Sequence, residues 1–469
     1  MVKKILLSVF VLALLGVVIK RFYFSRHNIE RSKLNVLLIT LDTMRADRLG
    51  FYGYDNPTSP NLDKLAEESV VFDNAIAQAS ITPVSHASIL TGLEPYRHGL
   101  RVLHGLIANR LEDKFTTLAE VWKEAGGKTA AFISAFPATK VFGLNQGFDH
   151  FDANFPLSDS GGVISQNGIV FTGKSQRRAK ETTDSVISWL RAQLHHRQPL
   201  FMWVHYFDPH DTLVLPPGEV VKKLMDYKFR PVSQKKGDVL RSLYDCEVHY
   251  MDDQIGNLLN EFKKQGLWDK TVVVIVADHG EGLGDHDWWA HGLLYQEQIR
   301  VPLLIRIPGI KGGSRINSIV RTIDLMPTIL AAAEINTKLW PYMDGISLIN
   351  AMRMGHTNEP LIAYSESVNM LTYGRPDNEG LHIKDDKLYC LIKGTHKFIY
   401  HQLQPKKSEY YNLSEDPKEL NNLAAQQPKE MSSMFQSLNG LNALSGIMPG
   451  MTPTDLERLR HLKSLGYIQ

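Results

Sequence analysis

Carboxylate and imidazole side chains gather at the ends of three strongly hydrophobic stretches of the sequence. Asp42 follows the run LNVLLITL, and Asp278 and His279 follow TVVVIVA. A third stretch, FMWVHYFDPH, carries His205 and ends in His210. Oxygen and imidazole ligands together suit Zn²⁺ or Mn²⁺, whereas Ca²⁺ prefers oxygen ligands. These residues predict a site for one divalent metal ion (Zn, Mn or Ca), although a cap or a polar turn would explain each residue taken singly.

The segment ASITPVSHASILTG offers a second kind of chemistry. Pro83 has no amide hydrogen and belongs in the first turn of a helix, which places Thr82 at the N-cap and Gly92 near the helix end. On these residues alone, Thr82 is a capping hydroxyl. A hydroxyl at the positive end of a helix can also act as a nucleophile when a metal lies beside it. We expect Ser85 and His86 to organise the start of this helix.

Strand-like and helix-like segments alternate along most of the chain. The expected strands are 34–42, 128–134, 199–208, 271–280 and 301–309, and the expected helices are 61–69, 117–125, 179–194 and 239–265. This alternation predicts an α/β fold with a doubly wound, mostly parallel sheet flanked by helices. Because open parallel sheets bind ligands at the carboxyl ends of their strands, the residues named above should meet at one edge.

The remaining segments suggest how the chain is divided. Residues 156–178 and 216–236 show little periodicity, and we interpret them as an exposed loop and an irregular insertion. From about residue 355, LHIKDDKLYCLIKGTHKFIYH alternates like antiparallel strands, and a last helix is expected to end in LRHLKSLGYIQ. We therefore divide the chain into an N-terminal segment, 1–33, a catalytic α/β domain, 34–354, and a small C-terminal α+β subdomain, 355–469.

The amino terminus predicts attachment to a membrane. MVKK precedes the uncharged run Ile5–Ile19. We prefer an uncleaved signal anchor to a cleaved signal peptide, because no A-x-A-like site precedes Lys20, and to a buried helix. The catalytic domain is then expected on the extracytoplasmic side, periplasmic or extracellular. The basic residues that follow the run argue for the opposite orientation.

Composition restricts the partners. Of the 469 residues, 43% are hydrophobic and 22% charged, as in folded globular proteins, and a net charge of +2 gives no reason to expect a nucleic-acid partner. The two cysteines, Cys246 and Cys390, neither establish nor exclude an oxidising compartment.

Taken together, these stretches resemble the sulfatase branch of the alkaline-phosphatase superfamily. The similarity runs in order from about residue 34 to 425, through NVLLITLDTMRADRLGFYG, SHASILTGLEPYRHGLR, ADHGEGLGDH, HGLLYQEQIRVPLLI, TIDLMPTIL and YYNLSEDPKELNNLA. The resemblance implies that Thr82 is the nucleophile. It implies that the metal ligands are Asp42, Asp278, His279 and Thr82 itself.

The resemblance also implies roles for further residues. His210 and His291 match the histidines that hold the transferred group or protonate the leaving oxygen. Arg45 and Arg101 are weaker candidates for oxyanion contacts, and His205 is a candidate for substrate binding.

Two departures from the family pattern bear on the chemistry. Sulfatases with a formylglycine nucleophile carry Cys, or occasionally Ser, followed by x-Pro-x-Arg, whereas this chain has Thr82 in that place and His86 in place of the Arg. The family's Gly-Lys-Trp-His stretch aligns with residues 133–136, Ile-Ser-Ala-Phe, and Lys140 lies nearby. Threonine nucleophiles occur in phosphoethanolamine and phosphoglycerol transferases of the superfamily.

We therefore expect a metal-dependent, sulfatase-like hydrolase that cleaves a sulfate or phosphate ester through a Thr nucleophile and a covalent intermediate. One alternative is a membrane-tethered phosphoethanolamine- or phosphoglycerol-type transferase that acts on a lipid or envelope glycan. Another is an inactive sulfatase-fold protein that binds a glycan or partner.

Overall fold

The computed structural model describes residues 34–445 with interruptions. It leaves out 105–106, 156–162, 167–168, 173–175, 194–197, 211–215, 234, 358–359, 375–380 and 442. The expected anchor at Ile5–Ile19 and the last helix in LRHLKSLGYIQ lie outside the described residues. Within the described part of the chain, no helix has both the length and the apolar character needed to span a bilayer.

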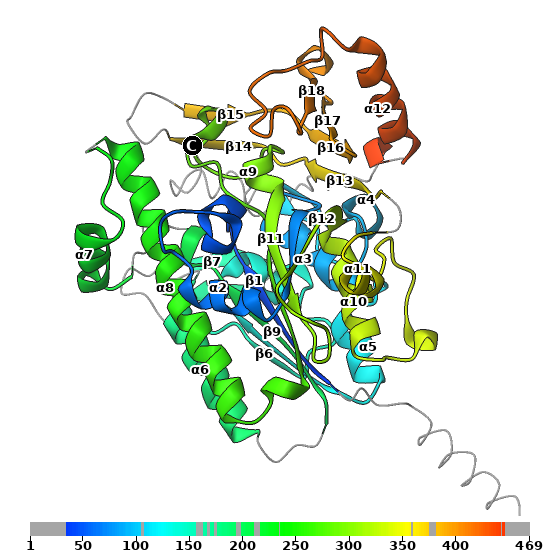
Figure 1. Ribbon diagram of the computed structural model, residues 1–469. Helices are drawn as coiled ribbons and strands as arrows, with labels where there is room; N and C mark the ends of the chain where they lie inside the picture. Colours follow the sequence, from blue (N-terminus) through cyan, green and yellow to red (C-terminus); the bar gives the residue numbers. More distant parts are fainter. Residues whose placement is uncertain are drawn as a thin grey trace, which may run out of the picture.

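An eight-stranded sheet forms the centre of the larger domain (Figure 1). Its order is β12 (Ser314–Arg321), β2 (Val70–Ile76), β11 (Arg300–Arg306), β10 (Thr271–Ala277), β1 (Asn35–Leu41), β9 (Leu200–Tyr206), β5 (Lys128–Ile133) and β6 (His150–Asp152). Strand β11 is antiparallel to both of its neighbours, and every other pairing is parallel. The predicted doubly wound, mostly parallel sheet is confirmed.

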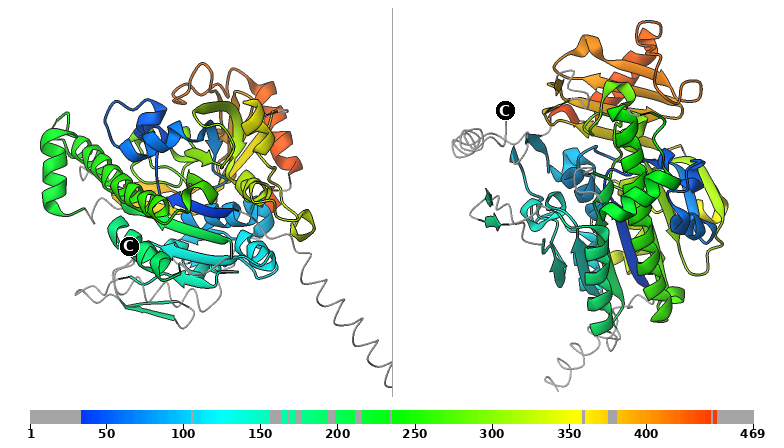
Figure 2. Two further views of the ribbon diagram at one scale, coloured as in Figure 1. Left: turned by 60° about the horizontal axis from the view of Figure 1, so that its bottom comes forward. Right: turned by 90° about the vertical axis from the view of Figure 1, so that its left-hand side faces the viewer.

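Helices cover both faces of this sheet (Figures 1 and 2). One layer contains α2 (Pro60–Glu67), α6 (Ala179–Ala192) and α8 (Lys236–Lys264), and the other contains α3 (Thr82–Thr91), α5 (Leu118–Glu124) and α10 (Leu325–Ala332). Because both faces are covered, β1 and β10 are buried along almost their whole length. The short helices are α4 (Pro95–His98), α9 (Gln296–Ile299) and α11 (Ile349–Met354).

Two segments that we expected to be irregular contain regular structure. In 216–236, helix α7 spans Gly218–Tyr227. Its buried Val221 and Leu224 are three residues apart, and Leu224 packs against Cys246 of α8, so the helix covers an apolar surface. In 156–178, strands β7 (Val163–Gln166) and β8 (Ile169–Thr172) pair as an antiparallel hairpin.

The expected C-terminal strands are confirmed, and they join a second sheet of four. Its order is β13 (Ile362–Ser367), β16 (Leu388–Lys393), β17 (His396–His401) and β18 (Glu409–Asn412), all antiparallel, with α12 (Pro428–Gly440) packed against it. Strands β14 (Leu371–Gly374) and β15 (Leu381–Lys384) form a separate hairpin. A small hairpin in the larger domain joins β3 (Val102–His104) and β4 (Ile107–Ala108).

The second sheet is joined to the larger domain close to α3. Strand β13 runs beside the segment that precedes this helix: Ala79 and Glu366 form a parallel bridge, and the Glu366 amide donates to the Gln78 carbonyl at 2.9 Å. The Ser365 hydroxyl also donates to the Ala77 carbonyl, at 2.5 Å. The C-terminal strands therefore support the backbone that leads to Thr82.

Candidate active site

The carboxyl ends of β1, β9 and β10 meet at one place in the sheet. Leu41 lies opposite Ala277 in the parallel pairing of β1 with β10, so the next residues, Asp42 and Asp278, emerge side by side. On the other side of β1, His205 of β9 lies opposite Thr40. The predicted convergence of these strand ends is confirmed by the register.

Asp42, Asp278 and His279 form a candidate metal site. One ligand atom from each residue lies within 4.8 Å of the others, and all three side chains are fully buried. His279 donates through Nδ1 to the Gly280 carbonyl at 2.9 Å, which leaves a lone pair on Nε2. Within the described residues, Asp42 Oδ1 and Asp278 Oδ2 have no hydrogen-bond partner. Two carboxylate oxygens without a hydrogen-bond partner and an imidazole nitrogen with a lone pair fit a divalent cation.

The pKa shifts of these three residues also fit a bound cation. Burial raises the pKa of Asp42 to about 6. Burial, and then the charge of Asp42, raise the pKa of Asp278 well above its ordinary value, while burial and the neighbouring His291 lower the pKa of His279. Two like charges in a buried site repel each other, and a bound cation would offset that repulsion.

Thr82 is placed differently from the position that the sequence predicted. It is the first residue of α3, and Ile81 is the N-cap, so the helix begins one residue earlier than expected. No side chain caps this helix end. The Thr82 hydroxyl instead lies 3.2 Å from His279 Nε2, beside the buried Asp42 carboxylate. The structure contradicts the capping interpretation and brings Thr82 to the metal site.

Ser85 and His86 hold the start of α3 against the sheet, as expected. The Ser85 hydroxyl donates to the Asp278 carbonyl at 2.6 Å. His86 Nδ1 donates to the Thr82 carbonyl at 2.8 Å, and its Nε2 lies 3.0 Å from the Thr40 hydroxyl, which also accepts from Trp203 Nε1. Burial lowers the pKa of His86 to about 3, so it is neutral. A neutral ring completes this network where the family pattern has Arg.

His210 and His291 face each other across the site. Their Nε2 atoms are 3.3 Å apart, and His291 donates through Nδ1 to the Ser80 carbonyl at 2.9 Å. The ring of His291 lies 4.6 Å from that of His279, centroid to centroid. His210 ends a 3₁₀ turn, Asp208–His210, in which its amide donates to the Phe207 carbonyl.

The three substrate-binding candidates have different surroundings. His205 is fully buried, and its Nε2 lies 3.2 Å from Asp42 Oδ2, so it orients the carboxylate of a candidate metal ligand. Arg101 pairs with Glu366 through two hydrogen bonds, at 2.7 and 2.8 Å, and both side chains are about 1% exposed. This arginine is committed to a protein carboxylate in the structure, and its contact with substrate stays a prediction.

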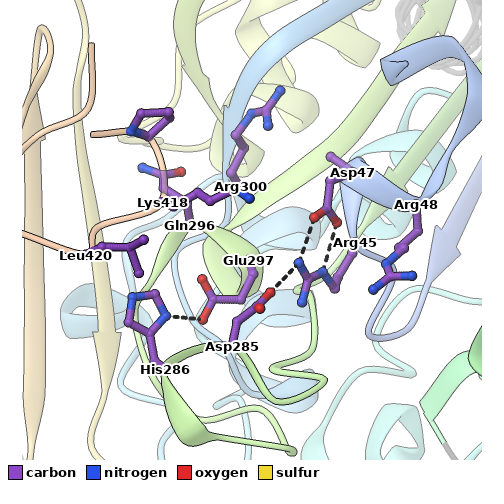
Figure 3. Close-up of a pocket in the computed structure, with 12 residues that line it drawn as sticks. Arg45, Asp47, Arg48, Asp285, His286, Gln296, Glu297, Arg300, Lys418 and Leu420 are labelled. Atoms are coloured by element: carbon purple, nitrogen blue, oxygen red, sulfur yellow. Dashed lines mark hydrogen bonds and ion pairs between the residues drawn. The ribbon is translucent and has the colours of Figure 1, made fainter. Parts of the chain in front are cut away.

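Arg45 lines a pocket of about 450 Å³ between the larger domain and the loop after β18 (Figure 3). Its guanidinium pairs with Asp47 at 2.6 Å and with Asp285 at 2.7 Å, and it donates to the carbonyls of Glu281 and Gly282. Arg45 therefore holds the loop after His279 in place. A role in oxyanion contact stays a prediction for this residue too.

The family's Lys–His pair has no structural replacement at residues 133–136. Ser134 donates to the His205 carbonyl at 2.5 Å, and Lys140 is exposed. Sequence reasoning also missed Thr40 and Trp203, which hold His86. Their polar atoms lie inside hydrophobic strand runs, where only the parallel register of β1 and β9 shows that they meet.

Comparison with known proteins identifies the family. The family model described as "Sulfatase" matches residues 34–335, and that described as "N-sulphoglucosamine sulphohydrolase, C-terminal" matches 284–443. An arylsulfatase of Clostridium perfringens is 25% identical over 455 residues, covering 83% of this chain and 90% of that protein.

A further relative and a solved structure are similar over most of the chain. The multifunctional alkaline phosphatase superfamily protein PehA of Trinickia caryophylli is 24% identical, covering 84% of this chain and 91% of that protein. The solved structure of Ps i-CgsB in complex with k-i-k-neocarrahexaose matches with a TM-score of 0.71 and 18% identity, over 91% of this chain and 97% of that one, and shows the same fold. With its strand-end acids, its helix α3 and this match over most of its length, the chain belongs to the sulfatase family of hydrolases.

Proposed function

We propose that this protein hydrolyses a sulfate or phosphate ester with Thr82 as the nucleophile, through a covalent intermediate. Asp42, Asp278, His279 and the Thr82 oxygen would hold one divalent cation, Zn, Mn or Ca. The observation that carries the proposal is the Thr82 hydroxyl, which caps nothing and lies 3.2 Å from His279 Nε2, beside the two buried carboxylates. Its place at the amino end of α3 favours the developing alkoxide.

In the first step, Thr82 Oγ attacks sulfur or phosphorus. The new Oγ–S or Oγ–P bond forms as the bond to the leaving oxygen breaks, and the hydroxyl proton passes to the Asp42 carboxylate that it faces. A divalent cation, when bound, supplies charge stabilisation for the ester oxygens and acidifies the hydroxyl.

The histidine pair supplies a proton to the leaving oxygen. Neutral His291 carries its one ring proton on Nδ1 and donates it to the Ser80 carbonyl. The proton between the two Nε2 atoms therefore belongs to His210. This proton passes to the departing alcohol. Water then attacks the sulfo- or phospho-threonine and gives one proton to the histidine pair, while Asp42 returns its proton to Thr82 as the anion leaves.

A transferase is the second candidate, favoured by one specific observation. The nucleophile position holds a threonine, and the Lys–His pair that serves sulfate in the family is missing. In a transferase, an acceptor alcohol of a lipid or envelope glycan would replace water in the second step. An inactive binding protein is disfavoured because all three metal ligands lie together in a buried group.

We also propose that the segment Ile5–Ile19 tethers the protein to a membrane, with the catalytic domain on the extracytoplasmic side. The support is the uncharged run itself, with basic residues on both sides. Protease treatment of cells stripped of their outer envelope, with the plasma membrane intact, and of broken cells tests the orientation. Digestion only after the cells are broken would place the domain in the cytoplasm.

The function is tested on the full-length chain, purified in detergent with Mn²⁺ or Zn²⁺. The probes are 4-nitrophenyl sulfate, 4-nitrophenyl phosphate and bis(4-nitrophenyl) phosphate, with Thr82→Ala and Thr82→Ser beside the wild type. We expect turnover of at least one ester, a loss of about 10³-fold or more in Thr82→Ala, and partial activity in Thr82→Ser, which keeps a hydroxyl.

The outcomes separate the candidates. Full activity in Thr82→Ala would exclude this nucleophile. Turnover of the phosphorus esters alone would retire the sulfate interpretation. Metal binding without turnover of any ester would favour the transferase, which needs its own acceptor.

A further inference from the structure

One face of strand β15 lies against the loop that carries His291. His382 and Lys384 are two residues apart on this strand, so their side chains share a face, and each is only 5% exposed. The His382 ring packs edge-on against Trp288, with centroids 5.4 Å apart. In Figure 1 the β14–β15 hairpin lies beside α9, the helix that follows this loop.

Lys384 fixes the segment between β13 and β14. Its Nζ donates to the Ser367 carbonyl at 2.9 Å, to the Asn369 carbonyl at 2.5 Å and to Asn369 Oδ1 at 3.3 Å. An ammonium group only donates hydrogen bonds, so it orients all three oxygens toward itself. Burial lowers the pKa of Lys384 to about 7, which is the cost of keeping a cationic group at this position.

The segment that Lys384 holds in turn holds the backbone next to His291. The Ser367 hydroxyl donates to the Gly292 carbonyl at 2.6 Å, and Trp288 Nε1 donates to the His291 carbonyl at 3.1 Å. Gly292 has a φ of +104°, and a Cβ atom there would come within 3.4 Å of Asn369 Nδ2. The carbonyls of His291 and Gly292 are therefore both fixed by groups that contact β15.

We propose that Lys384 is a positioning residue for His291. By orienting Ser367 and Asn369, it fixes the Gly292 carbonyl, and so the backbone beside His291 and the direction in which the imidazole Nε2 meets His210, the proton donor to the leaving oxygen. This inference rests on the proposed function, in which the His210–His291 pair protonates that oxygen. A hydrocarbon side chain of similar length would fill the space but would not orient the three oxygens.

The test uses the dependence of rate on the leaving group. A nitrophenolate leaves readily without a proton, whereas a phenolate is more basic and depends on protonation, so loss of the proton donor affects phenyl esters more. We compare 4-nitrophenyl and phenyl sulfate, and the corresponding phosphates, on the full-length metal-loaded protein. We expect Lys384→Met to lower kcat for the phenyl ester about tenfold or more, and for the nitrophenyl ester less than about threefold.

Two further variants separate positioning from folding. Lys384→Arg keeps a donor and is expected to restore part of the phenyl ester rate. Lys397→Met is the matched control, because Lys397 is also a fully buried lysine of this subdomain and pairs with Glu419 at 2.5 Å. It is expected to lower stability and leave the ratio of the two rates unchanged.

Failure of the inference is distinguishable from failure of the proposed function. If His291→Asn lowers kcat equally for the phenyl and the nitrophenyl ester, the role proposed for the histidine is wrong. The positioning role is overturned if His291→Asn lowers kcat more for the phenyl ester while Lys384→Met keeps the wild-type ratio of the two rates. It is also overturned if Lys397→Met changes that ratio as Lys384→Met does. If Lys384→Met does not fold, Ser367→Ala decides, because it removes the hydroxyl that contacts the Gly292 carbonyl and Asn369 Oδ1 and should shift the ratio in the same direction.

Discussion

At the scale of single residues, the candidate metal site is defined by charge. Asp42 and Asp278 are fully buried, and each has one carboxylate oxygen without a hydrogen-bond partner in the described part of the chain. Buried charge without a partner destabilises a fold, because the carboxylates lose their hydration and also repel each other. A site that is costly when empty is expected to gain stability on binding a cation.

This gives a prediction for Asp278→Asn. In EDTA, the variant should melt at a higher temperature than the wild type, because one of two repelling charges is gone. Added Mn²⁺ or Zn²⁺ should stabilise the wild type by about 2.7 kcal/mol at a hundredfold excess over Kd, and the variant hardly at all. Calorimetry with and without metal measures both effects. The control is Asp269→Asn, since this exposed residue precedes the same strand; equal metal stabilisation in Asp278→Asn and wild type would contradict the site.

The position of Thr82 shows the limit of sequence reasoning at this scale. Pro83 correctly predicted where a helix starts, yet the helix begins one residue earlier than expected, and this frees the hydroxyl from capping. Helix ends inferred from caps are uncertain by a residue or two. The ion pairs of Arg45 and Arg101 could not be predicted either, because their partners Asp285 and Glu366 lie more than two hundred residues away in the chain.

At the scale of elements, the central strands were predictable, whereas the edge strand β12 and its neighbour β2 were not. Central strands such as β1 and β10 are covered on both faces, so they are continuous hydrophobic runs. Strand β12 lies at one edge and is only partly buried, and β2 carries Asp73 and Asn74 in its middle. Such strands lack the continuous apolar signal. Helix α7 has a different signal, because its apolar residues Val221 and Leu224 are three positions apart, as on one face of a helix. That spacing could have predicted the helix.

The contact between Arg101 and β13 gives a prediction at this scale. Arg101→Leu alone should lower the free energy of unfolding by about 3–5 kcal/mol, because it leaves Glu366 buried without its cation. The double variant Arg101→Leu/Glu366→Leu should recover most of that loss. Urea titrations measure both.

The same variants test whether Arg101 also contacts substrate. If the double variant folds and keeps wild-type KM on the nitrophenyl esters, Arg101 serves only to join β13 to the larger domain. A large rise in KM in the folded double variant would restore the oxyanion role.

At the scale of the whole molecule, the site belongs to both parts of the chain. The larger domain supplies the three residues of the candidate metal site, while β13 supports the segment before Thr82, and Ser367 holds the Gly292 carbonyl next to His291. The sequence predicted that a C-terminal α+β unit exists. It could not predict this docking, because the contacts join residues far apart in the chain and depend on backbone carbonyls, which every residue has.

Docking through Lys384 makes stability depend on pH. The pKa of this lysine is about 7 in the folded protein and near its ordinary 10.5 in the unfolded chain. Between these values the unfolded state binds more protons, so this residue makes the free energy of unfolding rise with pH, by up to about 1.4 kcal/mol per pH unit. Below pH 7 both states are protonated, and the contribution no longer changes.

We therefore expect the wild type to gain stability relative to Lys384→Met as the pH increases from 7 to 9. Differences in urea unfolding free energy at each half pH unit give the slope, and other titrating groups cancel in the comparison. Lys384→Arg should track Lys384→Met, since an arginine stays charged throughout this range. Parallel curves for wild type and Lys384→Met would mean that the lysine reaches solvent and that the C-terminal subdomain docks on the His291 loop less tightly than its hydrogen bonds indicate.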